Sequence, residues 1–174
     1  MLNSVMLKPF LAGTTALALT LVVAQAQTQA RKGSTPEERA KAVEIARSLE
    51  SDPLGKNAKE QRRWITLWLI EVPDINVKMC ISLLGPSMDI NKNYSTEIVT
   101  QMLPSEAAFI IQNPDKVKDY IAIYTAGVEG SLRAYEAILK AKPKSKWPYL
   151  DDLIQKRDKG DLGNHIREAA THCK

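Results

Sequence analysis

Apolar residues recur at helical spacing along most of the chain, and the clearest pattern runs from Pro114 to Lys142. At about 100° per residue, this segment divides into three stripes along a helix: one large and apolar, one of mostly small residues, and one polar. The large apolar stripe consists of Val117, Ile121, Tyr124, Val128, Leu132, Tyr135 and Leu139. Two apolar stripes need neighbours on two sides, which predicts a long helix near the middle of a bundle.

The ends of this helix are also marked. Asn113 is a good N-cap, Pro114 suits the first helical position and Pro143 ends the pattern. Gly127 and Gly130 lie on the small stripe, where a glycine costs about 1 kcal/mol relative to alanine. They predict close packing of a neighbouring helix, and the alternative is a ligand that lies across the bare backbone.

The polar stripe of this helix offers two ion pairs at the favourable spacing of four residues. Glu129 precedes Arg133, and Glu136 precedes Lys140. Each pair is expected to contribute about 0.2–0.5 kcal/mol to the helix.

Shorter segments with helical spacing precede and follow the central helix. Thr35, Pro36 and Glu38 give the first of them a capping-box start. No segment alternates like a strand, and no hairpin turn separates two apolar runs. Helices are expected over residues 36–50, 58–71, 75–84, 94–103, 105–111, 148–159 and 162–172. The predicted fold class is therefore all-α, a compact bundle of about five to seven helices around one long central helix.

Two tryptophans stand out in the second helix. Trp64 and Trp68 are four residues apart, so their rings are expected to stack on one helix face. Core packing is the simpler interpretation. A ligand platform or carbohydrate surface requires at least one exposed indole.

The first 26 residues resemble a signal peptide. Lys8 supplies a basic n-region, residues 10–23 form an uncharged apolar h-region, and residues 24–26, Ala-Gln-Ala, fit a signal-peptidase cleavage site. Cleavage is expected after Ala26, with a cut after Ala24 or an uncleaved anchor as alternatives. The mature chain then keeps 148 of the 174 residues, with a polar, disordered lead-in over 27–34 and one α-helical domain over 35–174. No later segment is apolar enough to span a membrane, so an exported, periplasmic or secreted, soluble protein is predicted.

The charge and the cysteines limit the function further. The whole chain carries +4, and only Lys8 leaves with the signal peptide, so the mature charge of +3 gives no strong nucleic-acid signal. Cys80 and Cys173 are the two cysteines, and an even count in an exported chain predicts one disulfide.

The last helix carries the first candidate for chemistry. Asp161, His165, Glu168 and His172 follow one another at spacings of four, three and four residues. They share one helix face, so adjacent pairs could share a metal ion or a proton. The two histidines lie two turns apart, about 10.5 Å, which is too far for one ion without bending. A solvated polar stripe is the simpler interpretation.

A loop before the last two helices carries the second candidate. Its lysines alternate with small residues and precede an aromatic side chain, a composition that can grip phosphates or a membrane surface. The residues are Lys140, Lys142, Lys144, Lys146 and Trp147. Four nearby aspartates weaken the positive field, and a solvated loop is the alternative.

No motif for a catalytic nucleophile, a nucleotide or a c-type haem is present in the sequence. No cofactor is therefore expected, and the sequence leans away from an enzyme. The leading hypothesis is a non-enzymatic module that binds an unidentified macromolecule in the cell envelope or outside the cell. The alternatives are a metal-binding protein or metal-dependent enzyme that uses the last helix, and a binder of anionic surfaces that uses the lysine loop.

Overall fold

A computed structural model describes residues 31–85, 89 and 91–173 of the chain. Residues 31–174 form one compact unit. The predicted signal peptide and the first part of the predicted lead-in lie outside the described residues.

The described residues contain helices and no strand, which confirms the predicted all-α class. The α-helices are α1 (Pro36–Ser51), α2 (Ala58–Glu71), α3 (Ser95–Thr100), α4 (Met102–Gln112), α5 (Tyr120–Ala141), α6 (Pro148–Asp158) and α7 (Leu162–Ala169). Three short 3-10 turns are η1 (Ile81–Leu84), η2 (Pro114–Lys116) and η3 (Ala170–His172). Within the described part of the chain, no helix combines the length and apolar character needed to cross a bilayer.

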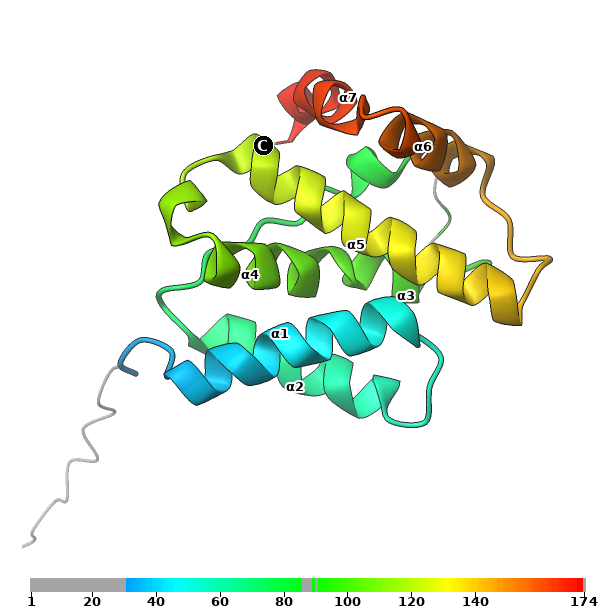
Figure 1. Cartoon of the computed structure of the whole chain (residues 1–174). Helices are drawn as coiled ribbons and strands as arrows, with labels where there is room; N and C mark the ends of the chain where they lie inside the picture. Colours follow the sequence, from blue (N-terminus) through cyan, green and yellow to red (C-terminus); the bar gives the residue numbers. More distant parts are fainter. Residues whose placement is uncertain (1–30, 86–88, 90, 174) are drawn as a thin grey trace, which may run out of the picture. The chain divides into compact units, whose positions relative to one another are not determined.

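The long helix α5 is the centre of the bundle, as its two apolar stripes predict. In Figure 1, α6 and α7 lie on one side of α5, while α4 and then α1 and α2 lie on the other. Two apolar clusters result. One joins α5 to α3, α6, α7 and η1, and includes Val128, Leu132 and Tyr135, each of which is buried. The other joins α1, α2 and α4, with Ile123 from α5.

The two glycines of α5 lie where α4 packs against it. A Cβ atom at Gly127 would come within 2.8 Å of Glu106 Cγ and 2.9 Å of Met102 Cγ. A Cβ atom at Gly130 would lie 1.8 Å from Ser105 Oγ. Close approach of a neighbouring helix therefore explains both glycines.

The predicted start of the central helix was wrong by six residues. The chain forms the turn η2 at Pro114–Lys116, and α5 begins at Tyr120, where the carboxylate of Asp119 accepts a hydrogen bond from Ala122 N at 3.0 Å. Asn113 instead is the C-cap of α4, and its Nδ2 donates to Phe109 O at 2.8 Å. Since α4 and α5 pack against each other, the chain must turn between them, and Val117 is left 45% exposed.

Two other predicted helix boundaries were also wrong. The segment before η1 is irregular rather than helical; β-branched Ile75 and Val77 disfavour a helix there, and Lys78 N bonds to the side chain of Glu106. Pro104 does not break a helix, because it is the third residue of α4. The first turn of a helix has no N–H groups that need intrahelical partners, so a proline fits there.

The beginning of the compact unit is fixed by hydrogen bonds. The capping box predicted for α1 is present, with Thr35 and Glu38 each bonded to the other's backbone N–H. Ahead of it, Ser34 donates from its backbone N and its hydroxyl to Asp74, both at 2.8 Å. Arg31 pairs with Glu38 and with Glu71. Part of the predicted lead-in therefore contacts the domain.

The C-terminal end is fixed by a disulfide. Cys80, just before η1, is bonded to Cys173, just after η3, and their Cα atoms are 5.6 Å apart. The two sulfurs join segments that are 93 residues apart in the sequence. A closed loop of this length is expected to stabilise the fold by roughly 4–5 kcal/mol on the chain-entropy model.

Candidate functional site

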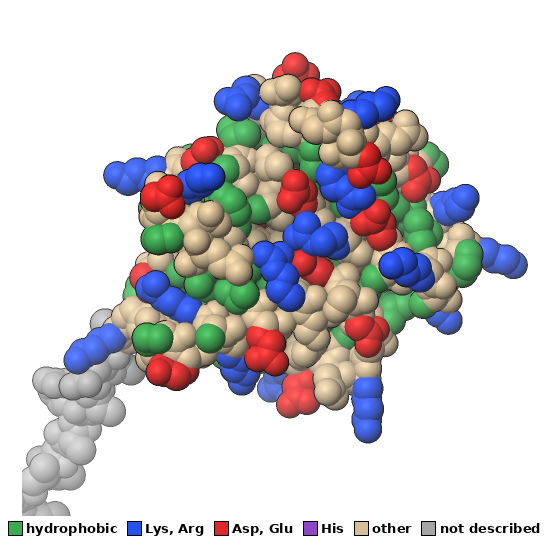
Figure 2. Space-filling model, viewed as in Figure 1, with side chains coloured by type: hydrophobic (Ala, Val, Ile, Leu, Met, Phe, Trp, Pro, Cys, Tyr) green, Lys and Arg blue, Asp and Glu red, His purple; other side chains and the backbone are tan. Residues whose placement is uncertain are grey.

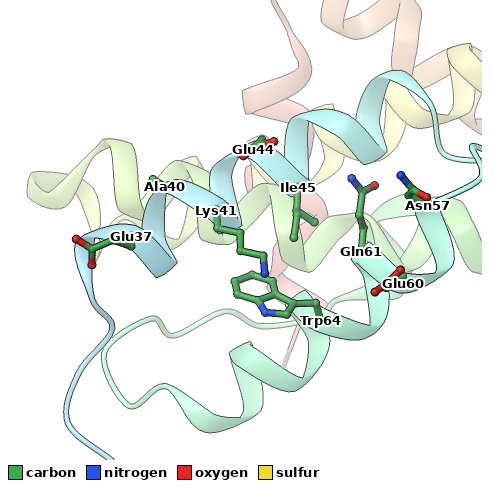
Figure 3. Close-up of a pocket in the computed structure, with 9 residues that line it drawn as sticks. All are labelled: Glu37, Ala40, Lys41, Glu44, Ile45, Asn57, Glu60, Gln61 and Trp64. Atoms are coloured by element: carbon green, nitrogen blue, oxygen red, sulfur yellow. The ribbon is translucent and has the colours of Figure 1, made fainter.

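A groove of about 720 Å³ lies between α1 and α2. Its walls come from the first ten residues of α1, from the first half of α2 and from the end of the connection between them (Figure 3). The lining residues are Glu37, Ala40, Lys41, Glu44, Ile45, Asn57, Glu60, Gln61 and Trp64. This volume is in the range of pockets that hold small molecules or single anchor side chains of a partner.

The indole of Trp64 forms one wall of the groove. It stacks on Trp68 with ring centroids 5.8 Å apart and planes 11° from parallel, which confirms the predicted stacking. Trp68 is buried at 4% exposure, whereas Trp64 stays partly exposed. The ammonium of Lys41 lies 4.3 Å from the Trp64 ring centroid, so this indole already holds a cation on its face (Figure 3).

Three carboxylates are among the residues that line the groove. Glu37 and Glu44 come from α1, and Glu60 comes from α2 (Figure 3). Hydrogen bonds from its own backbone and from the Thr35 side chain hold the pKa of Glu37 below its usual value of 4.5. With Lys41 as the single lining cation, the groove carries an excess of negative charge.

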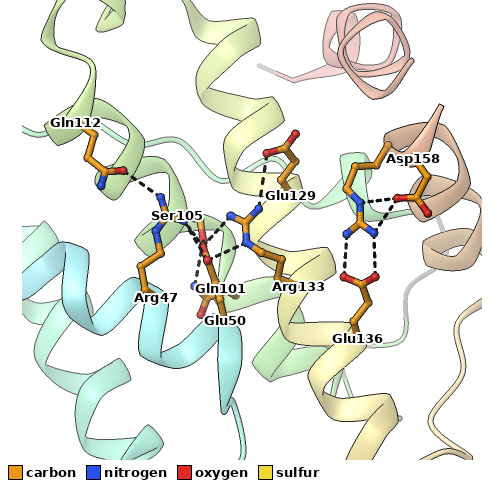
Figure 4. A network of polar contacts seen from close by, with 10 residues as sticks. Arg47, Glu50, Gln101, Ser105, Gln112, Glu129, Arg133, Glu136 and Asp158 are labelled. Atoms are coloured by element: carbon orange, nitrogen blue, oxygen red, sulfur yellow. Dashed lines mark hydrogen bonds and ion pairs between the residues drawn. The ribbon is translucent and has the colours of Figure 1, made fainter. Parts of the chain in front are cut away.

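The groove is built on helices whose positions are fixed by polar contacts. Gln61 Nε2 donates to Ser48 Oγ at 3.0 Å, which ties α2 to α1. Further along α1, Glu50 is 5% exposed and accepts hydrogen bonds from residues of two other helices (Figure 4). Ser105 Oγ donates to Glu50 Oε1 at 2.8 Å, and Arg133 Nε donates to Oε2 at 2.8 Å. These bonds lock α1 against α4 and α5.

The charges around Glu50 decide its ionisation. Burial alone raises the pKa of Glu50, but hydrogen bonds from Arg133 and Ser105 and the charge of Arg133 outweigh it. Arg47 adds bonds of 2.9 and 3.0 Å to the two carboxylate oxygens. The pKa of Glu50 therefore lies below 4.5, and the carboxylate is ionised at neutral pH.

Of the two ion pairs predicted along α5, Glu129–Arg133 is present, whereas Glu136–Lys140 is not found among the described residues. Arg133 does approach Glu129, but at 3.7 Å, and its closer partner is Glu50. Glu136 is held by two 2.8 Å hydrogen bonds from Arg157 of α6 rather than by Lys140 (Figure 4). Tertiary contacts gave these side chains better partners than the neighbours on their own helix.

A second buried carboxyl is Glu106 of α4, and among the described residues no cation offsets its burial. It is fully buried, and Oε2 accepts one hydrogen bond from Lys78 N at 2.9 Å. Within the described part of the chain, Oε1 has no hydrogen-bond partner. Burial raises the pKa of Glu106 to about 8, so this side chain is mostly protonated at neutral pH.

Three of the four metal-ligand candidates, Asp161, His165 and Glu168, line one hollow together with Lys156 and Arg167, and His172 does not. His165 Nε2 lies 3.3 Å from Tyr149 OH, and Asp161 Oδ1 accepts from Asn164 Nδ2 at 2.9 Å. The α-helix ends at Ala169, so His172 falls in the turn η3 and leaves the register shared with Glu168. Among the residues that the structure describes, no group of three or more His, Cys, Asp or Glu could hold a metal ion.

The lysine loop is anchored by aromatic residues. Trp147 N donates to Tyr135 OH at 2.8 Å, and Trp147 Nε1 donates to Asn93 O at 3.2 Å. Burial and the nearby Asp151 raise the pKa of Tyr135 to about 12, partly opposed by the bond from Trp147 N. The four lysines are all exposed: Lys140, Lys142, Lys144 and Lys146. The predicted loop begins too early, because Lys140 lies in the last turn of α5. Binding of anionic surfaces by this loop stays a prediction.

The face of the molecule seen in Figure 2 carries no large region of only positive or only negative charge. Figure 2 shows basic and acidic side chains interspersed over one face of the molecule.

Comparison with models of known protein families, with curated proteins and with solved structures found no match to this chain.

Sequence reasoning identified one wall of the groove and missed the rest. Trp64 was singled out by its spacing from Trp68. The acidic residues of α1 and α2 read as ordinary helix surface, because nothing in the sequence shows which helix faces become neighbours. Glu50 and Glu106 gave no signal either, since their burial depends on contacts between helices.

Proposed function

We propose that this chain is an exported, non-enzymatic binding protein whose α1–α2 groove binds a basic amphipathic segment of another protein. The observation that carries the proposal is the indole of Trp64, which is partly exposed, bears the Lys41 ammonium 4.3 Å from its centroid and lines a groove together with three carboxylates.

Charge complementarity favours a basic partner. A lysine or arginine of the partner can replace Lys41 on the Trp64 ring and pair with Glu37, Glu44 or Glu60. A cation on an indole face contributes about 0.5–2 kcal/mol, more when water is excluded. The displaced Lys41 can reach solvent, because it is on the exposed side of α1.

The partner also needs apolar residues. On α2, Leu67 and Ile70 follow Trp64 at intervals of three residues and are 48% and 75% exposed. They provide apolar area on the same helix that forms the groove wall. An amphipathic helix with lysines on one side and leucines on the other combines both requirements.

Export is supported by the signal-like composition of residues 1–26 and by the disulfide between Cys80 and Cys173. Disulfides persist mainly in oxidising compartments outside the cytosol. Protein collected from its own host is expected to begin at Gln27 by N-terminal sequencing. A chain that begins at Met1 would contradict cleavage and leave the binding proposal intact.

The binding proposal is tested with a fluorescein-labelled synthetic helix of lysine and leucine residues, titrated with the purified chain. Fluorescence anisotropy is expected to show saturable binding. Trp64→Ala and the double variant Glu44→Gln/Glu60→Gln are each expected to weaken it about tenfold, roughly 1.4 kcal/mol. A peptide with glutamate in place of lysine is expected not to bind.

The matched control is Asp115→Asn/Glu168→Gln, which removes two exposed carboxylates away from the groove. It changes the net charge by the same amount as the groove double variant. Equal weakening by both double variants would show that only overall charge matters and would overturn the assignment to the groove, as would unchanged binding by Trp64→Ala.

A further inference from the structure

A second hollow, of about 330 Å³, lies where the start of α5 meets the segment before η1 and the end of the chain. Lys78, Tyr120, Tyr124 and Arg167 are among its lining residues, and it shares none with the α1–α2 groove. Figure 1 shows α7 beside the first turns of α5. Arg167 of α7 and Tyr120 of α5 both line the hollow.

The charge of this hollow is opposite to that of the groove. Among the described residues, Lys78 and Arg167 line it and no acidic side chain does. Within the described residues, neither of the two side chains has an ion pair, and the ammonium of Lys78 lies 5.1 Å from the centroid of the Tyr120 ring. Two cations without a carboxylate partner leave a local positive excess, which attracts an anion.

The two cations are carried on segments that are fixed to each other. The backbone N–H of Lys78 is bonded to Glu106, and Cys80, two residues later, is bonded to Cys173. Cys173 itself lines the hollow and follows Arg167 by six residues. The disulfide therefore holds the Lys78 segment close to the segment that follows Arg167.

Tyrosine hydroxyls add neutral donors. In the part of the chain that the structure describes, neither Tyr120 OH nor Tyr124 OH forms a hydrogen bond. Burial and the proximity of Glu106 raise the pKa of Tyr124, so its hydroxyl keeps its proton at neutral pH. Glu106, behind Tyr124, is mostly protonated at that pH and opposes an anion little.

We propose that this hollow binds a small dianion that carries an apolar group, of the phosphate monoester class. A guanidinium offers a fork of donors to phosphate oxygens and a lysine adds a point charge. The ring of Tyr120 is 54% exposed at the rim and provides apolar area for the substituent. The volume is at the lower end of small-molecule sites.

Isothermal titration calorimetry of the full chain with phenyl phosphate tests the site. Inorganic phosphate and phenol are titrated separately, because each carries one of the two groups of phenyl phosphate. Phenyl phosphate is expected to bind more tightly than either half. Lys78→Gln and Arg167→Gln are each expected to weaken it about tenfold, since each removes a charged hydrogen-bond donor. Tyr120→Ala is expected to reduce phenyl phosphate binding to the level of inorganic phosphate.

The controls are Lys159→Gln and Arg63→Gln, which remove exposed cations from α6's C-cap and from α2. Neither lines the hollow, so both are expected to bind phenyl phosphate as the parent chain does. The proposal is overturned if phenyl phosphate does not bind, or if the control variants weaken binding as much as Lys78→Gln and Arg167→Gln. Its outcome is independent of the peptide experiment, because the two sites share no lining residue.

Discussion

Glu50 and Glu106 are two buried glutamates on helices that pack against α5, and their surroundings differ in charge. Glu50 is 5% exposed and bonds to Arg47, Arg133 and Ser105, and its pKa lies below 4.5. Glu106 is fully buried, accepts one backbone hydrogen bond, and has its pKa raised by burial to about 8. Burial acts on both carboxyls in the same direction, and the arginines reverse its effect at Glu50.

The difference gives the two carboxyls different roles. Glu50 is an ionised link between α1, α4 and α5, and it positions the helix that forms one wall of the groove. Glu106 is mostly neutral at pH 7 and holds the irregular segment at Lys78 against α4. A glycine of α5 lies over each of them: Gly130 over Glu50 and Ser105, and Gly127 over Glu106.

Among the variants considered, Gly130→Ala is expected to lower the stability of the fold most. The new Cβ would lie 1.8 Å from Ser105 Oγ and 2.3 Å from Ser105 Cβ, so α4 and α5 must separate and the Ser105–Glu50 bond is lost. We expect a loss of about 3 kcal/mol or more in the free energy of unfolding, measured by urea denaturation.

Gly163→Ala in α7 is the matched control for that variant, because nothing lies within 4 Å of the added Cβ. Alanine has the higher helix propensity, so this change is expected to be neutral or to stabilise by up to about 1 kcal/mol. If Gly130→Ala were equally harmless, the close packing of α4 on α5 around Glu50 would be wrong.

Glu50→Gln comes next. It keeps the shape of the side chain and removes the charge that two arginines share, so a loss of about 2 kcal/mol at pH 7 is expected. The guanidiniums of Arg47 and Arg133 are 44% and 39% exposed and can be solvated, which limits the loss. Because the folded pKa of Glu50 is depressed, its stabilisation is present above pH 4.5 and is lost as the pH falls through the folded pKa.

The control for Glu50→Gln is Glu129→Gln. Glu129 meets the same Arg133, but at 3.7 Å and with 39% of its side chain exposed. Exposed pairs of this kind contribute about 0.5 kcal/mol or less. Urea denaturation at pH 7 and near pH 3 should show a penalty for Glu50→Gln that disappears in acid; a penalty independent of pH would mean that its charge is not what stabilises the fold.

The residues of this comparison show where sequence reasoning succeeds and where it stops. The stripes of α5 follow from a period of 3.6 residues, which is local, and the glycines marked a close contact correctly. The even cysteine count predicted the disulfide. Arg133 and Glu50, in contrast, are 83 residues apart, and the sequence assigned Arg133 to Glu129 because only neighbours on one helix can be paired without a structure.

The groove and the irregular segment before η1 could not be predicted from the sequence, for the same reason. Each depends on which helix faces become neighbours: α1 against α2 for the groove, and α4 against the Lys78 segment for the backbone bond that replaces a helix there. Trp64 could be singled out because its partner Trp68 lies on the same helix. The acidic groove residues of α1 could not be singled out, because they come from a different helix.

Glu106→Gln tests the difference between the two glutamates directly. The same chemical change is expected to affect the pH dependence of stability in the opposite direction from Glu50→Gln. The folded pKa of Glu106 is raised from 4.5 to about 8. Its favourable contribution is therefore fully present below pH 4.5, declines as the pH rises, and is gone above about pH 8, where a buried unpaired carboxylate remains.

Glutamine cannot ionise, so Glu106→Gln is expected to remove that decline. At pH 5 it should lie within about 1 kcal/mol of the parent chain, since the amide can still accept from Lys78 N. At pH 9 it should be more stable than the parent by roughly 2–3 kcal/mol. Urea denaturation at pH 5, 7 and 9 measures both, and a Glu106→Gln chain that loses stability with pH as steeply as the parent would show that Glu106 is not the group that titrates.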